Sequence, residues 1–452
     1  MNRKITHALT APVILAATLL LLPALVEAAI DGTPVTGSIT LYAKSDYVSA
    51  GDGGSLALWG LTTGGRAQYP APTLILNQGD TVTVNLVNEL PAATSLVFPG
   101  HDVQSCTGAA GTLTCEAAAS DGVTAGTASY TFTATDAGTY LYHSGTDPDV
   151  QVDMGLFGAI VVRPYGFDLL HPQAYGDPAS AYEREYLFVL SEMDPVVHDL
   201  MLFYGSIASA NAWTLGDYLS RYWFVNGRTA PDTMAERDVY WLPTQPVNAM
   251  VMMHPGDRVL MRVVSAGRDL HPFHHHGNHS RVIARDGRLL SSGAGAGTDL
   301  SYQVFTIQAV PGETYDAIFE WTGKGLGWDA YGDPTDPAYA HDCVDSRDNR
   351  SGLPPADGYD DITWEYCADH GKPFPVLMPE QQDLVFGGFW SGSPYLGALG
   401  ALPPGEGGMN PVGGYTFMWH SHTEKELTND DIFPGGLMAM LLVVPPGQPV
   451  VE

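Results

Sequence analysis

The 452-residue sequence has little positive charge, few cysteines and, beyond its N-terminal segment, no apolar stretch long enough to cross a membrane. Lys and Arg number 20 against 50 Asp and Glu, which gives a formal net charge of −30. An acidic excess of this size excludes nucleic acid and anionic membrane surfaces as expected partners. It indicates a well-solvated surface that also attracts cations.

The N-terminal segment has the form of a secretion signal. Two basic residues precede a long apolar run, and the sequence VEA at 26–28 has the small-x-small pattern of a cleavage site. The run is almost long enough to anchor a helix, but Pro12 and Pro23 and the cleavage pattern favour removal. We predict a signal peptide over 1–28, a secreted protein (periplasmic or extracellular), and no stable membrane span after cleavage.

The four cysteines lack the CxxC spacing of zinc and redox motifs. Cys106 and Cys115 flank a loop rich in Gly, Ala and Thr, and Cys343 and Cys367 flank one rich in Asp, Pro and Gly. Three pairings are open, and two local disulfides are the most natural of them. Such bonds are typical of an oxidising compartment.

Short runs of Val, Thr, Tyr and Phe recur along the chain, as at 73–88 and 128–143, and are broken by Gly, Pro, Asn and Asp. Alternation with a period of two residues and frequent turns predict an all-β sandwich class.

An internal repeat divides the chain. YLYHSGT at 140–146 parallels FMWHSHT at 417–423, and each is followed by Gly-Leu and a Val-rich run that ends at Pro. We therefore predict two related β-domains, at 29–165 and 180–452. The second is too long for one sandwich, and we assign the excess at about 325–410 to an insertion before the last strand. A third domain over those residues is the alternative.

Most of the motif histidines lie in the second copy of the repeat, within the second predicted domain. His420 and His422 stand two apart in a strand-like run, so their side chains share one face. Five of the 15 histidines lie in HPFHHHGNH at 271–279, and packing explains such a tract poorly, because neutral imidazoles need buried partners and charged ones repel. Metal binding is the leading interpretation, ahead of a flexible His-rich loop. His143, in the first repeat, would add a ligand from the other domain.

These motifs resemble those of the multicopper oxidases, the cupredoxin-fold family of laccases and ferroxidases. HPFHHHG at 271–277 is similar to the HPxHxHG motif of that family, and the segments at 138–158 and 419–438 resemble two further motifs. The resemblance spans nearly all of the mature chain except the insertion. It implies two cupredoxin-like β-sandwich domains with a long loop insertion in the second. It also implies an oxidoreductase in which a type 1 copper passes electrons to a trinuclear cluster that reduces dioxygen.

The resemblance assigns metal-ligand roles to six histidines. His271 matches a type 1 ligand, His274 a type 2 ligand, and the type 3 matches are His143, His276, His420 and His422.

Several expected ligands are absent. Ser421 stands where the type 1 cysteine is expected and Glu426 where a type 1 histidine is expected. Two cluster histidines are missing from the first HxHG position, which reads VFPG at 97–100, and a third is replaced by Gly145. A blue copper site needs a thiolate, so none is predicted.

The remaining histidines suit one or two copper ions, with zinc as a competitor. We predict a secreted, multicopper-oxidase-like copper-binding protein with a reduced all-His site. It is either an oxidoreductase acting on a small molecule or metal ion, or a non-catalytic copper-binding or structural protein of the envelope or extracellular space. The sequence assigns no catalytic residue. It leaves open whether the site lies within one chain or between the subunits of a homo-oligomer.

Overall fold

The computed structural model describes residues 30–205, 217–321 and 414–444, with short pieces at 343–345, 358–360, 367, 395–397, 400–401, 409–410 and 450. The predicted signal peptide and most of the predicted insertion lie outside the described residues. Within them, no helix combines the length and the apolar character needed to cross a membrane. Strands dominate, as the alternating sequence pattern predicted, and the all-β cupredoxin-like class is confirmed.

The first half of the chain forms two sheets. One has the order β1 (Thr33–Pro34), β4 (Ala71–Asn77), β11 (Phe157–Arg163), β10 (Gly138–His143). The other has the order β3 (Ser55–Thr62), β2 (Ser38–Ser49), β5 (Thr81–Asn88), β9 (Gly126–Thr133), β6 (Val103–Thr107). A small ribbon of β7 (Ala109–Ala110) and β8 (Cys115–Glu116) follows β6, and a short helix, α1 (Pro148–Gln151), lies between β10 and β11.

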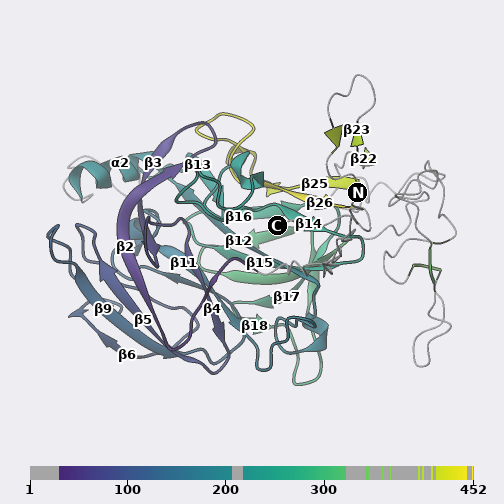
Figure 1. The fold of residues 1–452 in the computed structure, drawn as a ribbon, viewed down its shortest axis with the longest axis horizontal. Helices are drawn as coiled ribbons and strands as arrows, with labels where there is room; N and C mark the ends of the chain where they lie inside the picture. The colour runs from purple at the N-terminus through teal and green to yellow at the C-terminus, as the bar shows by residue number, and fades with distance from the viewer. Residues whose placement is uncertain are drawn as a thin grey trace, which may run out of the picture.

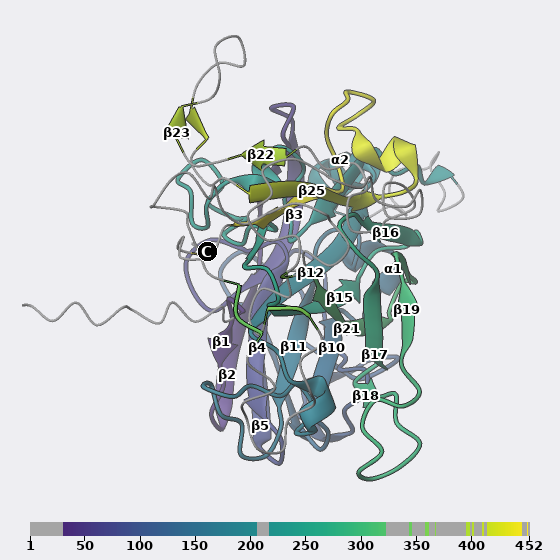
Figure 2. The same ribbon diagram turned by 90° about the vertical axis from the view of Figure 1, so that its right-hand side faces the viewer.

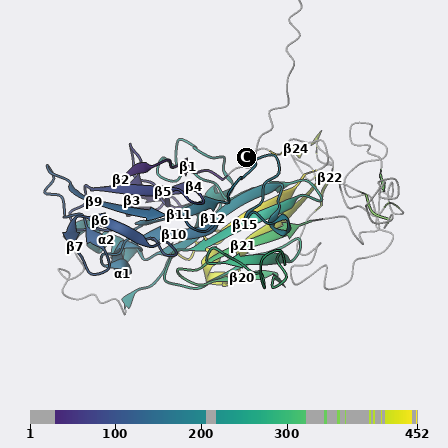
Figure 3. The same ribbon diagram turned by 90° about the horizontal axis from the view of Figure 1, so that it is seen from below.

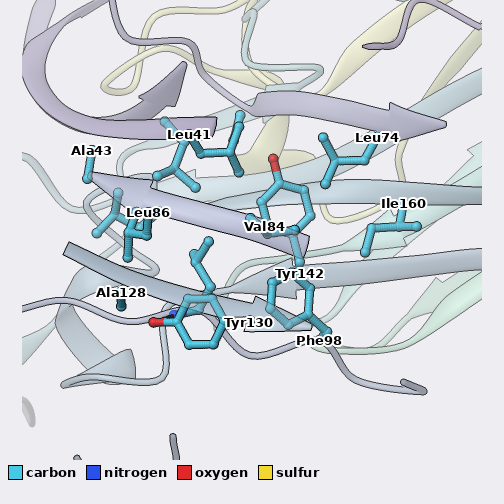
Figure 4. Close-up of a cluster of buried hydrophobic side chains, with 14 of the residues drawn as sticks. Leu41, Ala43, Leu74, Val84, Leu86, Phe98, Ala128, Tyr130, Tyr142 and Ile160 are labelled. Carbon is cyan, nitrogen blue, oxygen red and sulfur yellow. Dashed lines mark hydrogen bonds between the residues drawn. The ribbon is translucent and has the colours of Figure 1, made fainter. Parts of the chain in front are cut away.

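Alternation along β5 produces the core of this half. Val82, Val84 and Leu86 are fully buried, whereas the residues between them are partly exposed. Apolar side chains from the facing sheet, among them Leu74 and Tyr142, complete the cluster (Figure 4). Each buried aliphatic side chain contributes about 1.5–3 kcal/mol to the hydrophobic stabilisation.

The second half also forms two sheets. The first has the order β13 (Tyr222–Val225), β12 (Arg184–Met193), β15 (Arg258–Ser265), β21 (Thr314–Glu320), β17 (Ser280–Arg285), β18 (Arg288–Leu289), with β19 (Tyr302–Val304) paired to β17. The second has the order β14 (Val251–Met253), β26 (Met438–Val443), β25 (Gly414–Ser421), β16 (His271–His275), β20 (Thr306–Ala309), with β22 (Tyr395–Gly397) paired to β25.

Helix α2, one hairpin and three 3-10 helices complete the described residues. Helix α2 (Pro195–Tyr204) follows β12 and contacts β3, so it lies against the first half of the chain. The hairpin of β23 (Gly400–Ala401) and β24 (Met409–Asn410) precedes β25. The 3-10 helices span Pro178–Ser180 (η1), Asp232–Met234 (η4) and Glu424–Leu427 (η7). The purple and blue strands of the first half lie beside the green and yellow strands of the second (Figures 1 and 3).

Both predicted disulfides are present. Cys106 is bonded to Cys115 and Cys343 to Cys367, and the chain has no free cysteine. The pairing by sequence proximity is therefore confirmed, and no thiol remains for a metal.

The internal repeat folds the same way twice. β10 pairs antiparallel with β11, and β25 pairs antiparallel with β26. Just beyond each first strand, a backbone N–H donates to a leucine carbonyl at the same distance: Ser144 to Leu156 at 2.9 Å, and Ser421 to Leu437 at 2.9 Å. His143 and His420 thus occupy equivalent positions at the ends of β10 and β25.

A buried network of charges joins the two halves. Arg163 of β11 donates to both carboxylate oxygens of Glu185 in β12, at 2.6 and 2.7 Å. Arg262 of β15 contacts Glu185 at 2.5 Å, Thr139 of β10 at 2.7 Å and Asp316 of β21 at 3.4 Å. Two cations and two anions balance one another, which is the condition for burying them without a large cost.

Candidate metal centre

The pairing of β16 with β25 gathers the histidines of the second half. The antiparallel register places His274 opposite His420. Directly opposed residues project from the same face of a sheet, with Cβ atoms about 4.5–5.5 Å apart. His276 and His422 each follow by two positions, so all four imidazoles belong to one face. Figure 2 shows β16 and β25 beside each other.

Three of these histidines bring their ligand atoms together. One nitrogen each from His274, His276 and His420 lies within 4.8 Å of the others. The Nε2 atoms of His276 and His420 are 3.2 Å apart. Two nitrogens bound to one tetrahedral ion at about 2.0–2.1 Å would be separated by roughly 3.3 Å. The spacing therefore fits two imidazoles that share one ion.

His422 stands at the open edge of the cluster. Its ring centroid is 4.9 Å from that of His274 and 5.6 Å from that of His420, and the residue is exposed to solvent. The cluster thus has three inner imidazoles and one at the solvent boundary.

Hydrogen bonds at Nδ1 fix the orientation of two rings. The Nδ1 atom of His420 donates to the Ser421 carbonyl at 2.6 Å. The Nδ1 atom of His274 is hydrogen-bonded to the Thr306 hydroxyl at 2.9 Å. In both rings Nε2 is left as the atom available to a metal, the arrangement found for metal-ligating histidines in general. The indole of Trp419 donates to the backbone carbonyl of His276 at 3.0 Å and holds that turn of the chain.

The surroundings keep two of these imidazoles neutral. Burial is the main cause that lowers the pKa of His274, and repulsion from the nearby imidazoles adds to it, so that the pKa falls to about 3. Burial also lowers the pKa of His420 to about 4, although its bond to the Ser421 carbonyl acts in the opposite direction. A neutral imidazole is the ligand form, so at neutral pH neither ring must lose a proton before it can bind a metal.

His143 is not a member of this cluster among the described residues. Its Nδ1 atom donates to the Ser144 carbonyl at 2.8 Å, which repeats the bond of His420. The side chain lines a cavity of about 310 Å³ between the two halves, together with Glu192 and Arg268. Burial lowers the pKa of His143 as well.

His271 is also separate from the cluster. Its Nδ1 atom lies 2.9 Å from Glu426 Oε2, and its Nε2 atom lies 2.8 Å from Glu192 Oε2. Both ring nitrogens are therefore engaged by carboxylates. Burial alone would lower the pKa of His271, but the hydrogen bonds and charges of the two glutamates outweigh it and raise the pKa to about 10.

The position of one absent ligand, Gly145, is closely packed. A Cβ atom at Gly145 would lie 2.7 Å from Val97 Cγ1 and 3.1 Å from Ser95 Oγ. Pairing with His143 holds the backbone of Val97, so a side chain at 145 would require the Val97 side chain to turn away.

Two residues that hydrogen-bond to these histidines were not indicated by any sequence motif. Thr306 lies in β20 and carried no signal, since a threonine in a strand is ordinary. Glu192 is a charged residue inside the otherwise apolar run of β12, and it is buried. A carboxylate in such a run indicates a buried partner and could have been recognised.

Comparisons with known proteins agree with these motifs. Residues 61–166 match the family model described as multicopper oxidase. Multicopper oxidase MCE of Talaromyces pinophilus is 35% identical over 108 residues, which is 22% of this chain and 16% of that protein. Copper resistance protein A of Escherichia coli is 24% identical over 325 residues, 66% of this chain and 49% of that protein. The matches thus span half or less of these relatives.

A solved structure extends the similarity to the whole fold. The blue copper oxidase from Nitrosomonas europaea superposes with a TM-score of 0.54 at 17% identity, covering 90% of this chain and 86% of that one. At this identity the likeness establishes the fold alone.

Proposed function

Because the chain is related to the multicopper oxidases, we propose that it binds copper at an all-histidine site and acts as an oxidoreductase on a small molecule or a metal ion. The observation that carries the proposal is the convergence of His274, His276 and His420, whose ligand atoms lie within 4.8 Å of one another. The set suits one or two ions. Copper bound there would supply one-electron chemistry.

The donor set favours particular metals. Imidazole nitrogens suit Cu(II) and also Zn(II), and no thiolate is available to select between them. Ser421 holds the position of the expected cysteine, and all four cysteines are in disulfides. Copper-loaded protein should therefore lack the intense blue absorption of a thiolate-bound copper. A strong band of that kind in the visible spectrum would contradict the assignment.

The route by which the protein leaves the cell is part of the proposal. The two disulfides are typical of an oxidising compartment. Together with the signal-peptide pattern at 1–28, they support secretion to the periplasm or the cell exterior. Amino-terminal sequencing of the exported protein should start after Ala28.

We infer that His143 takes part in the site between two copies of the chain in a homo-oligomer. His143 shares its Nδ1 hydrogen bond with His420 and keeps Nε2 available, yet it is not in the cluster of its own chain. Light scattering of copper-loaded protein should then show an oligomer that His143→Ala weakens. A stable monomer with full copper content would count against this arrangement.

The reaction is tested by oxygen uptake with phenols, Fe(II), Mn(II) and Cu(I) as substrates. Copper-loaded wild type should consume oxygen with one of them, and a His420→Ala variant should not. A second candidate function, copper binding without turnover, is favoured by the engagement of both His271 nitrogens, which leaves no ligand at the expected type 1 position to hold a copper that receives electrons. No uptake by fully loaded protein would favour that candidate.

A further inference from the structure

A buried triad of charged side chains stands on the face of β16 opposite the histidine cluster. Glu192, His271 and Glu426 form it, and their side chains are 0%, 0% and 6% exposed. A carboxylate accepts hydrogen bonds and donates none when it is ionised. Both nitrogens of His271 contact such an oxygen, at 2.8 and 2.9 Å, so two ionised glutamates require a ring that carries both protons.

The backbone is built around one of the glutamates. The second oxygen of Glu192 accepts from the N–H groups of Arg268 and, at 3.0 Å, Asp269. Any Cβ at Gly267 would overlap the Glu192 carboxylate, so only glycine lets this loop close around it. These contacts stabilise negative charge on a carboxylate that is 0% exposed.

The triad joins three segments that are distant in the sequence. His271 begins β16, which carries His274, and Glu426 lies in η7, four residues after His422. Glu192 belongs to β12 of the facing sheet. The same positions, 271, 421 and 426, are those at which the resemblance to multicopper oxidases predicted a type 1 copper.

We propose that Glu192, His271 and Glu426 form a metal-free charge clamp in place of that copper, and that the clamp positions the two strands that carry the histidine cluster. The imidazolium supplies the positive charge between two carboxylates that a cation would otherwise supply. Ser421, which is fully buried, uses its hydroxyl to accept from the Thr423 N–H at 3.1 Å and holds the turn to His422. The raised pKa of His271 agrees with a ring that stays charged.

The first test measures how many protons the His271 ring carries. In metal-free protein labelled with 15N-histidine, NMR at pH 8 should show an imidazole with both N–H protons that is absent from a His271→Gln variant. Loading with Zn(II), which is diamagnetic and suits the same imidazole ligands, should leave that signal in place. A singly protonated His271, or loss of its signal on zinc binding, would overturn the proposal.

The second test asks whether the charge clamp positions the histidine cluster. Glu426→Gln keeps the shape of the side chain and removes its charge, whereas Glu424→Gln changes an exposed residue of the same 3-10 helix and serves as the matched control. The first variant should bind as many copper ions as wild type, with a lower unfolding temperature and an altered EPR spectrum. Glu426→Asp should recover part of both effects.

The outcomes separate this inference from the proposed function. A lost copper equivalent in Glu426→Gln, or an EPR spectrum and unfolding temperature equal to those of wild type, would overturn the clamp. If the wild type binds no copper, the NMR signal and the unfolding temperatures still decide whether the clamp exists.

Discussion

Copper binding should persist to a lower pH than free histidine allows. At an unperturbed pKa of 6.5, an imidazole at pH 5 is protonated in all but about one molecule in 30, so competition from two such ligands would weaken binding by roughly 1,000-fold. His274 and His420 have pKa values lowered to about 3 and about 4. Both are then neutral at pH 5, and these two ligands contribute almost no loss of affinity.

Copper affinity falls as the pH is lowered, because only the neutral imidazole is a ligand. A lowered pKa extends the neutral range downward, so protonation of His274 and His420 should cost almost no affinity between pH 7 and 5. The loss of affinity should grow as the pH approaches about 4, where half of the His420 rings carry a second proton. Titration against a chelator of known pH dependence, followed by EPR, measures this. An unfolded sample of the same protein is the control and should lose copper near pH 6.5. A thousandfold loss between pH 7 and 5 in the folded protein would refute the reasoning.

Two further outcomes follow from the described contacts. Arg262→Met leaves Asp316 without a compensating charge inside the protein, and the free energy of unfolding should fall by about 3–5 kcal/mol in denaturant titrations. Adding Asp316→Asn should recover part of that loss, and the exposed Arg66→Met should cost less than about 1 kcal/mol; a double variant no more stable than the single one would contradict this. His420→Ala should remove most bound copper in metal analysis, whereas His171→Ala, on the surface, should not, and wild-type occupancy in the first variant would count against the cluster.

Local geometry was predictable from the sequence, and long-range pairing was not. The two-residue spacing of His420 and His422 was enough to predict a shared face, because side-chain alternation is a property of any strand. The repeat likewise predicted that His143 would adopt the local setting of His420, and both make the same Nδ1 hydrogen bond. Its distance from the cluster depends on how the two halves pack, which no local pattern encodes.

The partners of His271 were hidden for the same reason. Glu426 was recognised only as a substitute for an absent histidine, and Glu192 lies 79 positions before His271. Neither spacing has a periodicity that indicates contact. A carboxylate within an apolar strand was the one available sign that a buried cation would be found nearby.

The contrast between His271 and His274 shows how neighbours determine what one residue type can do. The two residues lie three positions apart in β16 and are both buried, so burial pushes the pKa of each ring downward. Other imidazoles surround His274 and oppose a charge there, whereas two carboxylates bracket His271 and require one. The first environment produces a neutral ring with a lone pair for a metal, and the second a cation with none. Because successive residues of a strand face opposite ways, one strand can present a metal ligand on one side and a charge clamp on the other.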